Sequence, residues 1–252
     1  MPHRPEVSVS EVARGEVGAK NSKLPFFSAS GFWHETIYRF SQKILRFFSF
    51  IFFRLFTDLE IEGRENFRNP ILFSGRPVII AANHLSLFDP LVVGLAVPLF
   101  SGLYPLRFIA KDQLFIDLFS RIFFGSLGSM PAFRGQGVDK SLDAPKKILS
   151  KNGTVVIFPE GKRNTGEGLL PPRAGVGILA KEFPNCIIIP LAVSGTHKVS
   201  NPFSFSYPRV VARVGEPFSL SSSPRSVEES EPMAVAEYIM SKIAAEYEMI
   251  KK

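Results

Sequence analysis

The side chains best suited to chemistry lie in the heptapeptide NHLSLFD, residues 83–89, which follows the apolar run VIIAA. A histidine and a carboxylate thus stand together where a buried strand is expected to end. A carboxylate that bonds one imidazole nitrogen fixes the tautomer of the ring and stabilises the imidazolium when the other nitrogen takes a proton. His84 and Asp89 are therefore candidates for a general-base pair.

Other interpretations of the heptapeptide stay open. Asp89 followed by Pro90 is also typical of a helix N-cap with proline at the first helical position. A metal site is disfavoured, because the sequence has no HExxH or paired Cys/His pattern to supply further ligands. Serine hydrolase chemistry is disfavoured because Ser86 does not lie in a GxSxG elbow.

A second polar motif, FPEGKRN at residues 158–164, follows the apolar run TVVIF. Gly161 permits a tight turn, and Lys162 and Arg163 could hold a phosphate or a carboxylate. Glu160 could orient an arginine or bond a substrate hydroxyl. A P-loop is excluded by the spacing of the glycines and by Arg163 at the Ser/Thr position. The alternative is a solvated polar turn.

Two further positions carry weaker signals. Arg134 ends the segment GSMPAFR, and a lone loop arginine is by default exposed to solvent. Pro190 lies inside the apolar run CIIIPLAV, which predicts an edge strand or a bulge because proline has no N–H to donate.

The composition is that of a folded, basic protein. The 252 residues are 45% hydrophobic and 21% charged, with a net charge of +7, so a sizeable core is expected. A basic balance suits nucleic acid, an anionic membrane or a phosphorylated substrate. We expect no nucleic-acid partner, because the chain has no zinc-ligand spacing, RNP-like strand or dense basic stripe in its main part. The single cysteine, Cys186, excludes an intramolecular disulfide.

Short apolar runs rich in β-branched residues alternate with helical patterns through the main part of the chain. The expected strands are 59–63, 77–83, 107–111, 154–160, 186–193 and 209–215, and the expected helices are 90–100, 112–127, 139–151, 174–183 and 232–250. This alternation predicts a single α/β layered domain, residues 58–252, with a mostly parallel central sheet flanked by helices. Both polar motifs then fall at carboxyl ends of strands, where such domains bind ligands.

The sequence before this domain divides into two parts. Residues 1–30 read as a mobile polar leader. Residues 31–57 form an aromatic and basic block that is too often interrupted by charges for a typical membrane span. At helical spacing its basic residues fall in one stripe, namely Arg39, Lys43, Arg46 and Arg54. This stripe predicts an amphipathic helix in a membrane interface. Two alternatives stay open: a helix packed on the domain, and a full membrane span whose terminal Arg and Lys side chains reach the interface.

Four segments, NHLSLFD, GSMPAFR, FPEGKR and IIIPLA, occur in an order and spacing that resemble those of the glycerolipid acyltransferase family, typified by 1-acylglycerol-3-phosphate O-acyltransferases. The resemblance spans about residues 59 to 215 and is most specific in the first and third segments. It implies His84 as the general base and Asp89 as the group that orients it. Pro190 would belong to the acyl or acceptor pocket. The implied acceptor phosphate site comprises Arg134, Glu160, Gly161, Lys162 and Arg163, with Lys162 where the family usually has threonine.

The function implied by the resemblance is transfer of a fatty acyl group from acyl-CoA or an acyl carrier protein to 1-acylglycerol 3-phosphate, giving phosphatidic acid. No metal, cofactor or covalent enzyme intermediate is expected. The alternatives are another acceptor, such as glycerol 3-phosphate or a lysophospholipid, a lipid-dependent hydrolase, and a non-catalytic membrane-bound interaction protein. We expect the protein at an anionic membrane surface on the cytoplasmic face, held peripherally or monotopically through residues 31–57.

Overall fold

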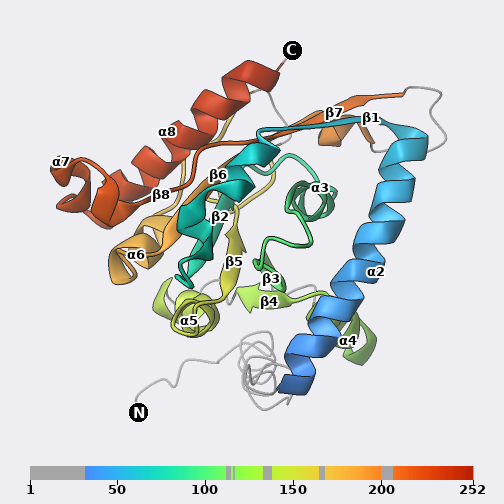
Figure 1. The fold of residues 1–252 in the computed structure, drawn as a ribbon, viewed down its shortest axis with the longest axis horizontal. Helices are drawn as coiled ribbons and strands as arrows, with labels where there is room; N and C mark the ends of the chain where they lie inside the picture. Colours follow the sequence, from blue (N-terminus) through green and yellow to red (C-terminus); the bar gives the residue numbers. More distant parts are fainter. Residues whose placement is uncertain are drawn as a thin grey trace, which may run out of the picture.

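One mixed sheet organises the described part of the chain, with strand order β1-β7-β6-β2-β5-β3-β4 and β8 paired to β6 (Figure 1). The computed structural model describes residues 32–111, 115, 117–132, 138–164, 168–199 and 207–251. The strands are β1 (Asp58–Glu62), β2 (Val78–Ala82), β3 (Leu106–Lys111), β4 (Ser129–Ala132), β5 (Thr154–Ile157), β6 (Ile187–Ser194), β7 (Arg209–Val214) and β8 (Phe218–Ser219).

The pairing of the strands is mostly parallel. Strands β2 to β6 run in one direction, whereas β7 and β8 are antiparallel to β6, and β1 is parallel to β7. Every residue of β2 and β5 is buried, as expected for strands covered on both faces. The prediction of a single α/β domain with a mostly parallel sheet is confirmed.

Helices cover both faces of the sheet (Figure 1). The helices are α2 (Phe32–Phe56), α3 (Asp89–Ala96), α4 (Leu118–Ser126), α5 (Val138–Leu149), α6 (Gly175–Glu182), α7 (Arg225–Glu228) and α8 (Pro232–Ile250). Short 3-10 helices are η2 (Arg64–Arg68), η3 (Pro70–Phe73), η5 (Thr196–Val199) and η6 (Leu220–Ser222). Side chains of α2 and α3 pack on one face with Ile80 and Ile189, and those of α5, α6 and α8 pack on the other with Ile79 and Ile188.

The edge position expected at Pro190 is wrong, because β6 lies between β7 and β2 in the interior of the sheet. The alternative, a bulge, is confirmed: Leu191 pairs with Val214 and Ile188 with Phe218, so the facing chain has one residue more than β6 between these pairs. The carbonyl of Pro190 accepts the N–H of Gly215, which immediately follows β7. The N and C=O of one strand residue point to the same side, so the missing donor of Pro190 faces the gap between β7 and β8. An interior strand tolerates proline here because its neighbour is interrupted.

Helix α2 has an unusual distribution of side chains, because it buries polar residues and exposes apolar ones. Gln42 is 5% exposed and bonds the backbone N–H and C=O of Leu106 as well as the carbonyl of Leu127. Arg46 turns inward to the carbonyls of Gly94 and Val97 at the end of α3. The exposed apolar residues are Ile37, Phe40, Ile44, Phe47, Phe48, Phe50, Ile51, Leu55 and Phe56. No helix within the described ranges is both long and apolar enough to cross a membrane.

Candidate active site

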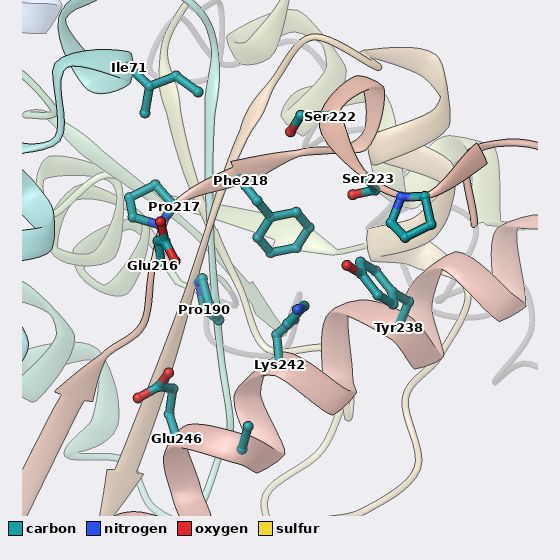
Figure 2. A pocket seen from close by; sticks show the side chains of 12 residues that line it. Ile71, Pro190, Glu216, Pro217, Phe218, Ser222, Ser223, Tyr238, Lys242 and Glu246 are labelled. Carbon is teal, nitrogen blue, oxygen red and sulfur yellow. The ribbon is translucent and has the colours of Figure 1, made fainter. Parts of the chain in front are cut away.

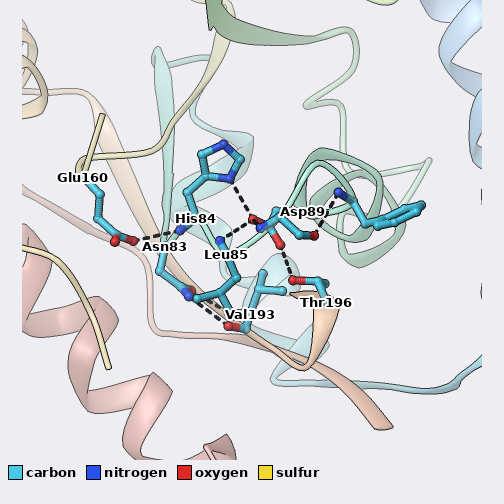
Figure 3. A network of polar contacts seen from close by, with 9 residues as sticks. Asn83, His84, Leu85, Asp89, Glu160, Val193 and Thr196 are labelled. Atoms are coloured by element: carbon cyan, nitrogen blue, oxygen red, sulfur yellow. Dashed lines mark hydrogen bonds and ion pairs between the residues drawn. The ribbon is translucent and has the colours of Figure 1, made fainter. Parts of the chain in front are cut away.

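His84 and Asp89 meet at the carboxyl end of β2 (Figure 3). The Nδ1 atom of His84 lies 2.7 Å from Oδ2 of Asp89. A carboxylate only accepts hydrogen bonds, so Nδ1 is the donor in this contact, and Nε2 is the nitrogen that can take a proton in the neutral form of the ring. The His84 side chain is 18% exposed, whereas that of Asp89 is 0% exposed. A buried carboxylate thus orients a partly accessible imidazole whose Nε2 can accept a proton.

The Asp89 carboxylate closes the turn that contains His84. Its Oδ2 also accepts the backbone N–H groups of Leu85 at 2.6 Å and Ser86 at 2.7 Å. Helix α3 begins at Asp89 with Phe88 as its N-cap, and no side chain caps it. The helix-cap interpretation of Asp89 is therefore wrong: its side chain points back to the preceding turn instead of forward to its own helix.

A buried hydroxyl that sequence reasoning missed completes the surroundings of Asp89. Thr196 Oγ1 donates to Oδ1 of Asp89 at 2.5 Å, and Thr196 is 0% exposed. The segment that carries Thr196 is held by Asn83. The side-chain amide of Asn83 donates to the carbonyl of Val193 at 2.9 Å and accepts the N–H of Val193 at 2.7 Å. The end of β6 therefore supports the His84 turn from one side (Figure 3).

Glu160 supports the same turn from the other side. Its Oε1 accepts the N–H of His84 at 2.8 Å and its Oε2 accepts the N–H of Leu170 at 3.0 Å. The N–H of Asn164 donates to the carbonyl of His84 at 2.7 Å. Burial raises the pKa of Glu160, while the N–H groups of His84 and Leu170 oppose the rise. Because both oxygens bind backbone amides, Glu160 is placed to hold the His84 backbone rather than a substrate phosphate.

The ring of Phe158 fixes the plane of the imidazole. The two rings stack with centroids 4.2 Å apart and an interplanar angle of 19°. Phe158 belongs to the FPEGKRN motif, so this contact joins the two polar motifs directly. The expected strand 154–160 ends earlier, at Ile157, and the residues that follow form the turn that carries Phe158 and Glu160.

Basic side chains gather at the turn after β5. Gly161 has a φ of +66°, and a Cβ there would lie 2.6 Å from Cδ of Arg173, so Arg173 packs directly against this glycine. Lys162, Arg163 and Arg173 are exposed. Arg173 is a further cation that sequence reasoning missed, because it lies outside the motif. Arg134 lies outside the described residues.

Pro190 lines a cavity that none of the other described candidate residues lines. The cavity, of about 460 Å³, lies on the face covered by α8, and Tyr238, Lys242 and Glu246 also line it (Figure 2). Neither His84 nor Glu160 lines this cavity. Its assignment to an acyl or acceptor pocket beside His84 remains a prediction. Within the described ranges, no group of three or more His, Cys, Asp or Glu side chains is arranged to hold a metal ion.

Comparisons with known proteins add a family and a fold. Residues 58–194 match the model of the family described as Acyltransferase. A Caenorhabditis elegans protein provisionally named as the 1-acyl-sn-glycerol-3-phosphate acyltransferase acl-1 is 32% identical over 115 residues, which are 44% of this chain and 42% of that protein. The match thus spans less than half of that relative's length. The crystal structure of the 1-acyl-sn-glycerophosphate (LPA) acyltransferase PlsC from Thermotoga maritima aligns over 96% of this chain and 91% of that chain, with a TM-score of 0.64 and 19% identity.

Proposed function

Because the chain belongs to the acyltransferase family, we propose that it transfers a fatty acyl group from an acyl thioester to the free hydroxyl of 1-acylglycerol 3-phosphate. The observation that carries this proposal is the His84–Asp89 pair beside a turn that bears Lys162 and Arg163 and against which Arg173 packs. A general base acts on a hydroxyl, and neighbouring cations suit an acceptor that carries a phosphate. The product would be phosphatidic acid.

The proposed reaction uses His84 first as a base and then as an acid. Nε2 of His84 takes the proton of the acceptor hydroxyl while its oxygen forms a bond to the thioester carbonyl carbon. The C–S bond then breaks, and the imidazolium gives its proton to the departing thiolate. Asp89 stabilises the imidazolium between these two steps. Atoms and charge balance without a metal or a covalent enzyme intermediate, and acyl-CoA or an acyl carrier protein supplies the thioester.

The acceptor phosphate is proposed to bind at the turn after β5. Lys162 and Arg163 are assigned this role, with Arg134 from the segment after β4, and Arg173 is added because it packs against Gly161. Gly161 allows the turn to bring its backbone close to an anion. Glu160 acts indirectly, through the backbone of His84.

We also propose that α2 lies in a membrane interface while it remains packed on the domain. Its outward apolar side chains suit the acyl boundary, and the neighbouring Arg39, Lys43 and Arg54 are exposed and suit anionic headgroups. Phe52 of α2 stacks on Phe88 with centroids 5.6 Å apart. Since Phe88 lies in the loop between His84 and Asp89, this contact would hold the catalytic loop next to the lipid surface that presents the acceptor.

The test is a thiol-release assay with detergent-solubilised protein. Acyl-CoA or acyl carrier protein thioester is mixed with 1-acylglycerol 3-phosphate, glycerol 3-phosphate or lysophospholipids. We expect thiol release that depends on 1-acylglycerol 3-phosphate and that falls roughly 10²- to 10⁴-fold in His84→Ala. The matched control is His197→Ala, since His197 is exposed on η5. Release without any acceptor would indicate a hydrolase, and no release with any donor would indicate a binding protein.

A further inference from the structure

The backbone of the β6 end delivers Thr196 to the rear of the Asp89 carboxylate. Gly195, immediately before it, has a φ of +81°, and a Cβ at that position would lie 2.0 Å from the carbonyl oxygen of Arg209. Only glycine fits both constraints. The chain therefore leaves β6 by a turn that places the Thr196 hydroxyl inside the protein, where its side chain has no access to solvent.

The two oxygens of Asp89 have different surroundings. Oδ2 accepts His84 Nδ1 and two backbone N–H groups, whereas Oδ1 accepts the hydroxyl of Thr196 at 2.5 Å. Within the described residues, no other hydrogen bond to Oδ1 is found. A buried carboxylate oxygen without a donor is unfavourable, so the hydroxyl and the donors to Oδ2 together fix the plane of the carboxylate.

We propose that Thr196 is a positioning residue for acyl transfer, whose hydroxyl holds the Asp89 carboxylate so that Oδ2 faces His84 Nδ1. This inference rests on the proposed function. Thr196 does not contact the reacting atoms. It acts through Asp89, which sets the tautomer and the orientation of the imidazole. Thr196 thus affects both the basicity of Nε2 and the direction in which Nε2 faces.

The placement of Asn83 supports this role. Its side chain makes two hydrogen bonds to the backbone of Val193, in the same segment that carries Thr196. The first and last residues of the NHLSLFD turn therefore both attach to the end of β6. Two attachments, one from Asn83 to the backbone of Val193 and one from Asp89 to Thr196, thus hold the turn against the end of β6.

Three substitutions separate the hydroxyl from the methyl group of Thr196. Thr196→Ser keeps the hydroxyl, Thr196→Val keeps the methyl group and the shape, and Thr196→Ala removes both. We expect Val and Ala to lower kcat about tenfold with KM for both substrates nearly unchanged, because a buried oxygen loses its donor. Ser should restore most of kcat. In ¹⁵N NMR of the imidazole, the fraction of the Nδ1–H tautomer of His84 should fall in Val and Ala and not in Ser.

The matched control is Thr57→Val, which removes another buried hydroxyl, one that donates to the carbonyl of Phe53 at 2.7 Å. It should leave kcat and the His84 tautomer unchanged. Wild-type kcat in Thr196→Val, or an impaired Ser with an active Val, would overturn the inference. If Val does not fold, equal kcat values for Ser and Ala would overturn it. An inactive wild-type protein would instead refute the proposed function, and the NMR comparison would still test the positioning of His84.

Discussion

At the scale of single residues, Glu160 is held in an environment that opposes its charge. Burial raises its pKa above the ordinary value of 4.5, so the folded protein binds a proton at a pH where the unfolded chain has released it. This group's contribution to stability is therefore greatest below pH 4.5 and is lost as the pH rises through the raised pKa. We expect the free energy of unfolding of the wild type, relative to Glu160→Gln, to decrease over that interval.

The measurement is chemical unfolding of both proteins at closely spaced pH values above and below the ordinary pKa of a glutamate. The control is Glu237→Gln, which alters an exposed carboxylate on α8. A difference curve for Glu160 that rises with pH would show that the backbone N–H groups of His84 and Leu170 outweigh burial.

The sequence was sufficient to predict the contact between His84 and Asp89, but not the contacts that Thr196 and Glu160 make with them. His84 and Asp89 are separated by one short turn, so their types and spacing predict their contact. Thr196 lies 107 residues from Asp89, and Glu160 lies 76 residues from His84. Those contacts exist only because β6 and β5 flank β2 in the sheet. Strand order is a property of the whole chain, and no local pattern near Thr196 reports it.

At the scale of elements, α2 has different properties on opposite sides of one helix. Its inner side donates and accepts hydrogen bonds through Gln42, and its outer side is apolar. The sequence predicted one basic stripe of Arg39, Lys43, Arg46 and Arg54, yet Arg46 points to the end of α3. Helical periodicity defines the angular position of each side chain around the axis but not which side packs on the sheet. Gln42 and Arg46 are polar, yet they lie on the packed side because their hydrogen-bond partners are buried there.

Substitutions on the two sides of α2 should therefore have different effects. Gln42→Ala should lower the free energy of unfolding by about 1–3 kcal/mol, because it leaves buried backbone groups of Leu106 unpaired. The triple variant Phe40→Ser/Phe47→Ser/Leu55→Ser should keep its stability, since these side chains are 65%, 60% and 64% exposed. It should reduce partition onto lipid vesicles roughly tenfold or more. Chemical unfolding and vesicle sedimentation measure the two quantities, and a stability loss in the triple variant would contradict the assignment of the outer side.

At the scale of the whole molecule, the net charge of +7 and the apolar outer side of α2 both favour the proposed partner, an anionic membrane. Anionic lipid attracts each nearby Lys or Arg by about 1 kcal/mol, and salt screens this attraction. Three exposed basic residues of α2, namely Arg39, Lys43 and Arg54, lie beside its apolar residues. We expect at least about tenfold stronger partition onto anionic than onto zwitterionic vesicles, with the preference falling at high salt.

Charge position and total charge can be separated with two triple variants. Replacement of the three α2 residues by glutamine should remove most of the preference for anionic vesicles. The control replaces Lys151, Arg225 and Lys242, which are exposed near α5, α7 and α8 on the other helical layer. Both variants lose the same net charge, so only a local binding surface distinguishes them. Equal losses in the two variants would mean that the whole molecule, and not α2, is attracted to the membrane, and the interfacial orientation of the helix would have to be abandoned.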